Sequence, residues 1–201
     1  MKQHPYSGDE SLWLDFQSGS ELALTQLMDQ YIEPMTYYGR KLSRNDDLIQ
    51  DCIQETFIEI WQYRQSLKAL QEIRPYLLTC LRRKIGKAIK KDNHISLEEN
   101  PPTLTFELDF SIEDRLVKNE EETQRLQELN RHINSLSKRR KEIIYLKFYQ
   151  NLSNEEIAQI MGVRYQTATN LLHEAISSLR ELIPSKSILS LLYTWGYLFA
   201  H

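Results

Sequence analysis

The side chains best suited to recognition chemistry lie on one face of a helix predicted to begin near Arg164. Hydrogen-bonding side chains recur there at positions i, i+1, i+4, i+5 and i+8, namely Tyr165, Gln166, Thr169, Asn170 and His173. Hydroxyl, amide and imidazole groups can both donate and accept hydrogen bonds, as the reading of base edges in the DNA major groove requires. The spacing therefore predicts a DNA-recognition face.

A preceding helix and a tight turn are expected to position this face. Ser153 and Glu156 lie three residues apart, which is the pattern of a capping box at a helix start. Gly162 follows the apolar face of that helix and is suited to end it in a left-handed conformation. The second helix is apolar at Ala168, Leu172, Ala175, Ile176 and Leu179. Together these signals predict a helix-turn-helix, although a plain helical hairpin that binds no DNA has the same pattern.

Charge is segregated along a chain whose net charge is only −3. The segment 74–91 holds seven basic residues and no acidic one, whereas 98–122 holds nine acidic residues and two basic ones, a net charge of −7. Proteins that bind DNA unaided usually carry a basic excess, because phosphate neutralisation supplies much of the affinity. The composition thus predicts a basic helix and a solvated acidic connector rather than a uniformly basic protein.

Other functions find little support in the residues. The five histidines are scattered without an HExxH or CxxC pattern, so we expect no metal site, no cofactor and no enzyme activity. Cys52 and Cys80 lie among apolar helical neighbours and are interpreted as buried free thiols. The N-terminus lacks the apolar core of a signal peptide, so we expect a cytoplasmic protein.

The predicted fold class is all-α, because Leu, Ile, Glu, Gln, Lys and Arg dominate and alternating strand patterns are scarce. We predict two small helical domains, 1–92 and 123–183, joined by an acidic linker at 93–122 and followed by an apolar tail at 184–201. Pro34 is expected to interrupt one helix of the first domain. The tail is too short for a typical membrane span, and we favour its packing on this protein over a role as a partner contact.

A helix predicted over 47–63, with Asn45 or Asp46 as its cap, carries two stripes. The apolar stripe is Ile49, Cys52, Ile53, Phe57 and Ile60. The second consists of Asp51, Gln54, Glu55 and Ile58 at i, i+3, i+4 and i+7. Polar side chains around an exposed isoleucine fit a protein contact, although solvated helix faces look similar.

Two segments in this order resemble one known family. DLIQDCIQETFIEIWQYR, at 47–64, is similar to the core of sigma-70 region 2. LSKRRKEIIYLKFYQNLSNEEIAQIMGVRYQTATNLLHEAISSLRE, at 136–181, is similar to sigma region 4. The short length resembles the extracytoplasmic-function (ECF) subfamily of RNA polymerase sigma factors. The resemblance implies a sigma region 2 bundle, a sigma region 4 helix-turn-helix, and promoter-specific transcription initiation with core RNA polymerase.

The resemblance also implies three contact sets. The polymerase β′ clamp would bind Asp51, Gln54, Glu55 and Ile58. The minus-10 element and the melted strand would be contacted by Arg82, Arg83, Lys84, Lys87, Lys90 and Lys91. The minus-35 element would meet Arg164, Tyr165, Gln166, Thr169, Asn170 and His173, with phosphate contacts from Arg139 and Arg140 and from the neighbouring Lys138 and Lys141. Further implied partners are the polymerase β flap and an anti-sigma factor, with no small-molecule substrate.

One departure from the family pattern weakens the predicted minus-35 helix. Family members often carry Lys or Arg at the positions of Thr169, Leu171 and Glu174, and this chain has none there. Strong binding of this helix to DNA without polymerase is therefore not expected, although tethering to polymerase would compensate. Two alternatives stay open: a stand-alone helix-turn-helix regulator, which would need its own affinity, and a purely protein-binding module.

Overall fold

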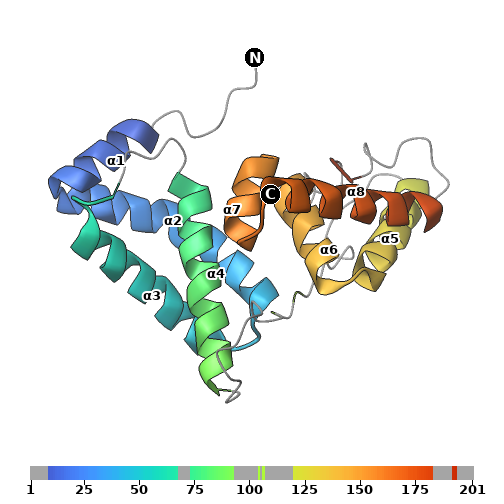
Figure 1. Cartoon of the computed structure of the whole chain (residues 1–201), viewed down its shortest axis with the longest axis horizontal. Coiled ribbons are helices and arrows are strands. Elements are labelled where there is room, and N and C mark those ends of the chain that lie inside the picture. The colour runs from blue at the N-terminus through green and yellow to red at the C-terminus, as the bar shows by residue number, and fades with distance from the viewer. Residues whose placement is uncertain are drawn as a thin grey trace. The chain divides into compact units, whose positions relative to one another are not determined.

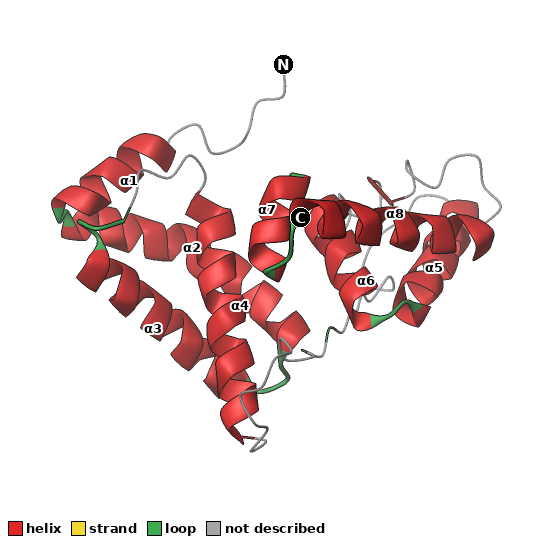
Figure 2. Cartoon of the chain, in the orientation of Figure 1, coloured by secondary structure: helices red, strands yellow, loops and turns green. Residues whose placement is uncertain are grey.

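The computed structural model describes residues 9–67, 73–92, 104, 106, 120–182 and 192–193. Within them, the secondary structure consists of helices and no strand, as the sequence predicts (Figure 2). The chain divides into two compact units, 1–104 and 105–201. None of the described helices is both long enough and apolar enough to cross a membrane.

In the part of the first unit that the structure describes there are four helices (Figure 1). They are α1 (Asp9–Ser18), α2 (Glu21–Leu42), α3 (Asp46–Tyr63) and α4 (Ile73–Asp92). Helices α2, α3 and α4 pack against one another, and α1 packs on α2. Asn45 caps α3 by accepting a hydrogen bond from the Leu48 amide at 3.0 Å, which fixes where this helix begins.

Helix α2 corrects the expectation that Pro34 interrupts a helix. It runs without a break for 22 residues with Pro34 inside it. A proline in a helix interior removes one backbone hydrogen bond, but it does not end a helix whose apolar face is buried on both sides of it. Leu27, Tyr31, Met35, Tyr38 and Leu42 form that continuous buried face. Tertiary packing therefore outweighs the local signal.

Close contact between α2 and α3 depends on Gly39. A Cβ atom built at this position would lie 2.6 Å from Cγ2 of Ile49, which is too close for two carbon atoms. The missing side chain lets the backbone of α2 approach the buried face of α3. That face consists of Ile49, Cys52, Ile53, Phe57 and Ile60, together with Thr56, and it matches the predicted apolar stripe.

The second unit holds the remaining described helices. They are α5 (Glu120–Ser135), α6 (Lys138–Ile144), the π-helix η1 (Tyr145–Tyr149), α7 (Asn154–Met161) and α8 (Tyr165–Leu182). Helix α8 packs against α5, α6 and α7. The core of this unit includes Ile143, Ile144, Ile157, Leu172 and Leu179.

Two segments outside these helices also contribute buried side chains. Phe106 is 2% exposed, and its ring lies 5.5 Å from that of Tyr145, measured between centroids. The connector is therefore not a solvated tether at this residue, because an aromatic ring gains more from burial than from solvent. In the predicted tail, Leu192 is fully buried and the Tyr193 ring meets the edge of Phe148 at 5.1 Å. Both tail residues pack on this protein, in agreement with the packing role that the sequence analysis favours for the tail. The rest of the tail lies outside the described residues.

Candidate nucleic-acid and protein interfaces

The helix-turn-helix is formed by α7, a tight turn and α8. Ser153 Oγ accepts a hydrogen bond from the Glu156 amide at 3.2 Å, and Glu156 Oε2 accepts one from the Ser153 amide at 2.6 Å. This reciprocal pair is the predicted capping box. Gly162 ends α7 with φ +65° and ψ +39°, the left-handed conformation expected of it. Local sequence signals thus set the start of α7 and the turn into α8.

Most of the predicted recognition side chains are exposed on α8 or just before it. Arg164, Tyr165, Gln166, Asn170 and His173 all lie at the surface. The Gln166 amide donates to the Asn170 side-chain oxygen at 2.9 Å, so the two amides are linked across one helical turn of this face. The opposite side of α8 is buried through Ala168, Leu172, Ala175 and Leu179. The fold therefore presents an amide-rich surface outward.

Thr169 lies less openly than the other predicted recognition residues. Its side chain is half-buried, and its buried Oγ1 has no hydrogen-bond partner within the described residues. Position 169 lies at the edge of the buried stripe of α8, one residue after Ala168. A base contact by this hydroxyl would need a rotation of the side chain or a close approach of the ligand.

The basic residues of α6 lie in two kinds of environment. Lys138 and Arg139 are exposed near the helix start, and Lys141 is half-buried. Arg140 instead reaches across to α8: its Nη2 donates to Glu174 Oε2 at 2.8 Å and its Nη1 donates to Ser178 Oγ at 3.4 Å. Ser137 occupies the N-cap of α6 without making a side-chain cap hydrogen bond. Arg140, one of the predicted phosphate contacts, is thus already engaged in an ion pair with Glu174.

The predicted protein-contact face of α3 lies at the surface. Asp51, Gln54 and Glu55 are at the surface, and Ile58 is 56% exposed although it is apolar. The other face of the same helix forms the core of the first unit. A single exposed isoleucine is ordinary on a protein surface, so what distinguishes this face is its position among the polar side chains of the predicted contact set.

The basic face of α4 is graded in exposure. Arg83, Lys87 and Lys91 are exposed, whereas Arg82, Lys84 and Lys90 are half-buried. Two tyrosines, one at the end of α3 and one on α4, also differ in exposure. Tyr63 is 59% exposed, and Tyr76 packs edge-on against the buried Trp13 with ring centroids 6.2 Å apart. Of the two tyrosines, Tyr63 is the one that offers an open stacking surface.

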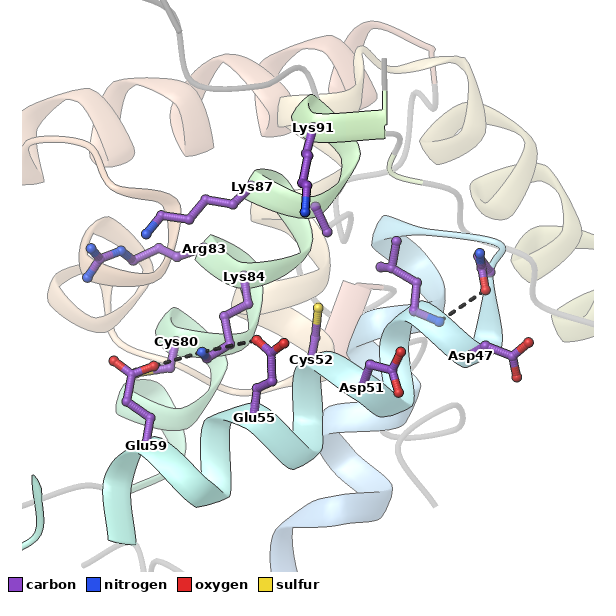
Figure 3. Close-up of a pocket in the computed structure, with 13 residues that line it drawn as sticks. Asp47, Asp51, Cys52, Glu55, Glu59, Cys80, Arg83, Lys84, Lys87 and Lys91 are labelled. Carbon is purple, nitrogen blue, oxygen red and sulfur yellow. Dashed lines mark hydrogen bonds and ion pairs between the residues drawn. The ribbon is translucent and has the colours of Figure 1, made fainter. Parts of the chain in front are cut away.

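A groove of about 650 Å³ runs between α3 and α4 (Figure 3). One wall carries carboxylates at every fourth residue of α3: Asp47, Asp51, Glu55 and Glu59. The other carries Arg83, Lys84, Lys87 and Lys91 of α4. Lys84 spans the groove, with Nζ 2.7 Å from Glu59 and 3.4 Å from Glu55 (Figure 3).

The ion pair between Lys84 and Glu59 shifts the pKa of both groups. The Lys84 ammonium lowers the pKa of Glu59 by hydrogen bonding and by charge. Burial acts to lower the pKa of Lys84, but the hydrogen bonds and charges of Glu59 and Glu55 outweigh it and raise that pKa. Both groups therefore stay charged over a wider pH range than in free solution. Lys84 is held in place as part of the α3–α4 packing.

The two cysteines are free thiols, as predicted. Cys52 is buried and Cys80 half-buried, and both line the groove. Burial raises the pKa of both thiols, that of Cys52 to about 11. Thiols that stay protonated at neutral pH are weak nucleophiles, so neither is poised for catalysis. The described residues contain no cluster of His, Cys, Asp and Glu suited to hold a metal ion.

Two residues of these surfaces were missed by the sequence reasoning. Glu59 was not assigned to any face, although its spacing of four from Glu55 places both carboxylates on one side of α3. The family pattern marks position 174 only by the absence of a basic residue, whereas the structure shows Glu174 as the partner of Arg140. The Glu59 signal was present in the spacing. The Glu174 pairing was not, because its partner is 34 residues away in the sequence.

Comparison with known proteins gives matches over both units. The model of Sigma-70 region 2 matches residues 27–95, and that of Sigma-70, region 4 matches residues 126–179. Together these two matches cover more than half of the chain. Among characterised proteins, the chain is similar to RNA polymerase sigma factor YlaC of Bacillus subtilis (strain 168). The identity is 24% over 164 residues, covering 79% of this chain and 91% of the relative.

Two solved structures were aligned with the chain. CnrH, in a structure of its complex with the cytosolic domain of CnrY, aligns with a TM-score of 0.56 at 18% identity, covering 89% of this chain and 99% of the other. The sigma factor RpoE of Bartonella quintana, solved with the anti-sigma factor NepR, aligns with a TM-score of 0.49 at 21% identity, covering 81% and 97%. The first of these supports the arrangement of helices described above.

Proposed function

The chain belongs to the RNA polymerase sigma-70 family, as an ECF sigma factor, and we propose which of its surfaces carry the contacts of that role. As a sigma factor, it binds core RNA polymerase and directs transcription initiation at specific promoters. We propose a division of labour in which the chain selects the promoter and helps to open it. The polymerase supplies catalysis and most of the DNA affinity, and this chain has no enzyme activity of its own.

The exposed face of α3 is the proposed site for the polymerase clamp. The observation that carries this assignment is Ile58, an apolar side chain left 56% exposed between Gln54, Glu55 and the next turn. Burying this isoleucine against a partner is favourable, and the surrounding polar side chains fix the register of the contact. Asp51 extends the same face by one turn. A helix with one face in the core and an apolar residue on the other fits a docking surface.

The exposed basic side chains of α4 are the proposed contacts to DNA around the minus-10 element. Arg83, Lys87 and Lys91 are the most accessible, and Arg82 and Lys90 flank them. Such side chains bind phosphates and carry little sequence information by themselves. Lys84 contributes to the positive field of this face, while its ammonium is held by Glu55 and Glu59. We therefore assign Lys84 a smaller direct share in binding DNA than the others.

The exposed face of α8 is the proposed reader of the minus-35 element. Gln166 and Asn170 are the strongest candidates for base contacts, because paired amides match the donor and acceptor pattern of adenine. Arg164, Tyr165, Thr169 and His173 border them, and Arg139 lies on the neighbouring α6. We propose that this weakly charged surface recognises DNA mainly when polymerase holds it there, in part through the β flap.

Regulation and location follow from the family rather than from a described surface. We propose that an anti-sigma factor holds the chain inactive until it is needed. We also place its action in the cytoplasm, where its polymerase partner works.

Binding to core polymerase tests the α3 assignment. The purified chain is mixed with core RNA polymerase and separated by size exclusion, as wild type and as Asp51→Arg/Glu55→Arg. We expect co-elution for the wild type and its loss in the variant, because two charges of the docking face are reversed. The matched control is Glu21→Arg/Asp29→Arg, which makes the same change at exposed positions of α2. Circular dichroism verifies that all three proteins are folded.

The opposite result would favour a different function. If the folded wild type does not co-elute, and instead shifts duplex DNA tightly without polymerase, the stand-alone regulator becomes the better assignment. Loss of co-elution in the α2 control as well would mean that the variants act through net charge and not through the α3 face.

A further inference from the structure

Helix α6 is joined to the recognition helix by an ion pair that the family assignment does not explain. Arg140 Nη2 lies 2.8 Å from Glu174 Oε2, and Arg140 Nη1 donates to Ser178 Oγ at 3.4 Å. Ser178 in turn donates to the backbone oxygen of Glu174 at 3.0 Å. The side chains are 34% and 56% exposed, so the pair lies at the surface. The guanidinium is thus anchored on α8 by two acceptors.

Glu174 belongs to the same exposed face as the proposed base-reading residues. It follows Asn170 by four residues, so the two lie one helical turn apart on one side of α8. Nowhere in the first ten residues of α8 is there a lysine or arginine, and Arg180 is confined to the last turn. Arg140 is therefore a guanidinium that the fold brings from α6 onto this face, and Glu174 is the carboxylate that it contacts there.

A carboxylate and a DNA phosphate offer arginine the same kind of acceptor. Both are anionic oxygen pairs that a guanidinium binds in a bidentate geometry. Exposed ion pairs contribute little to stability, so replacing one anionic acceptor of Arg140 by another costs little. When DNA approaches, Arg140 must leave Glu174 to bind a phosphate, and Glu174 then stands uncompensated close to the negatively charged backbone. Either state of the pair reduces the attraction between this face and DNA.

We propose that Glu174 is an intramolecular competitor for the DNA phosphate that Arg140 would otherwise bind, and that it lowers the affinity of the recognition helix for duplex DNA. The consequence is selectivity: the free chain binds DNA weakly, and recognition depends on polymerase. This inference rests on the proposed role of α8 as the minus-35 reader.

Glu174→Gln tests the proposal, because it removes the charge and preserves the shape of the side chain. The probe is a fluorescein-labelled duplex of mixed sequence, about three helical turns long, titrated with the full chain at several salt concentrations. We expect affinity at low salt to rise about 3- to 10-fold and the slope of log K against log salt to steepen by about one, the signature of one added phosphate contact. Glu181→Gln, the same charge change at an exposed position at the end of α8, should have a much smaller effect.

Arg140→Ala completes a double-mutant cycle. It should cost more affinity in the Glu174→Gln background than in the wild type, because only the former frees the guanidinium for DNA. Unchanged or weaker binding by Glu174→Gln would overturn the proposal and indicate that Glu174 positions Arg140 instead. An equal cost of Arg140→Ala in both backgrounds would also overturn it. Neither result touches the polymerase co-elution test, whose failure would separately remove the proposed function.

Discussion

The ammonium group of Lys84 on α4 lies 2.7 Å from the carboxylate of Glu59 on α3. Glu55, one turn earlier, is 3.4 Å from the same ammonium. A residue that the family pattern assigns to DNA is therefore also an electrostatic tie between the helix proposed to bind polymerase and the helix proposed to bind DNA. The two surfaces of the first unit share a structural element.

The strength of this tie is measurable by a double-mutant cycle. For Lys84→Ala and Glu59→Ala, we expect a coupling of about 0.2–1 kcal/mol in the free energy of unfolding, because Glu59 is largely exposed and water screens the pair. Urea unfolding of the wild type, the two single variants and the double variant supplies the values. The same cycle with Lys87→Ala serves as the control, since Lys87 acts on Glu59 only through a longer-range charge interaction. Equal coupling in both cycles would contradict a specific Lys84–Glu59 contact.

Stability should fall at alkaline pH because of buried groups in the first unit. Burial raises the pKa of Cys52 to about 11 from an ordinary value of 9.0, and that of Tyr76 to about 12 from 10.0. Between pH 9 and 12 the unfolded chain releases protons that the folded chain retains, so the free energy of unfolding decreases as pH rises. Urea unfolding across this interval measures the decrease. Cys52→Ala should flatten its lower part, and an unchanged profile in that variant would refute the assignment.

The capping box of α7 should contribute measurably to the helix-turn-helix unit. Ser153→Ala removes the acceptor of the Glu156 amide and should lower the free energy of unfolding by about 1 kcal/mol. Thermal unfolding followed by circular dichroism checks this value. Ser137→Ala is the matched control, because Ser137 is an N-cap residue without a side-chain cap hydrogen bond. A loss at Ser137 as large as that at Ser153 would show that the capping hydrogen bonds do not cause the effect.

Leu192 should behave as a core residue despite its position in the C-terminal tail. It is fully buried, so Leu192→Ala should cost about 2–5 kcal/mol through lost burial and the cavity left behind. Leu22→Ala, at a leucine that is 69% exposed, should change stability by no more than about 0.5 kcal/mol. Denaturant unfolding of both variants makes the comparison. A near-neutral effect of Leu192→Ala on stability would contradict the packing role and favour the tail as a contact for a partner.

Much of the fold and of the proposed site was predictable because the signals are local. The Ser153–Glu156 capping box and the left-handed Gly162 depend on residues a few positions apart, and the sequence determined both. The apolar stripe of α3 and its exposed opposite face, with Ile58, follow from helical periodicity alone. Periodicity also predicts which residues of α8 are exposed, except that it overestimates the exposure of Thr169.

Only the tertiary structure decided features that depend on residues far apart in the chain. Pro34 stays inside α2 because packing on both sides of it outweighs one lost hydrogen bond. The side chain of Phe106, within the acidic connector, is buried because its ring packs against that of Tyr145. The pairing of Arg140 with Glu174, and of Lys84 with Glu59, depends on which helices the fold brings together. The sequence determines the charge that each residue carries. The packing of the helices determines which partner that charge has, and therefore whether it is available to bind DNA.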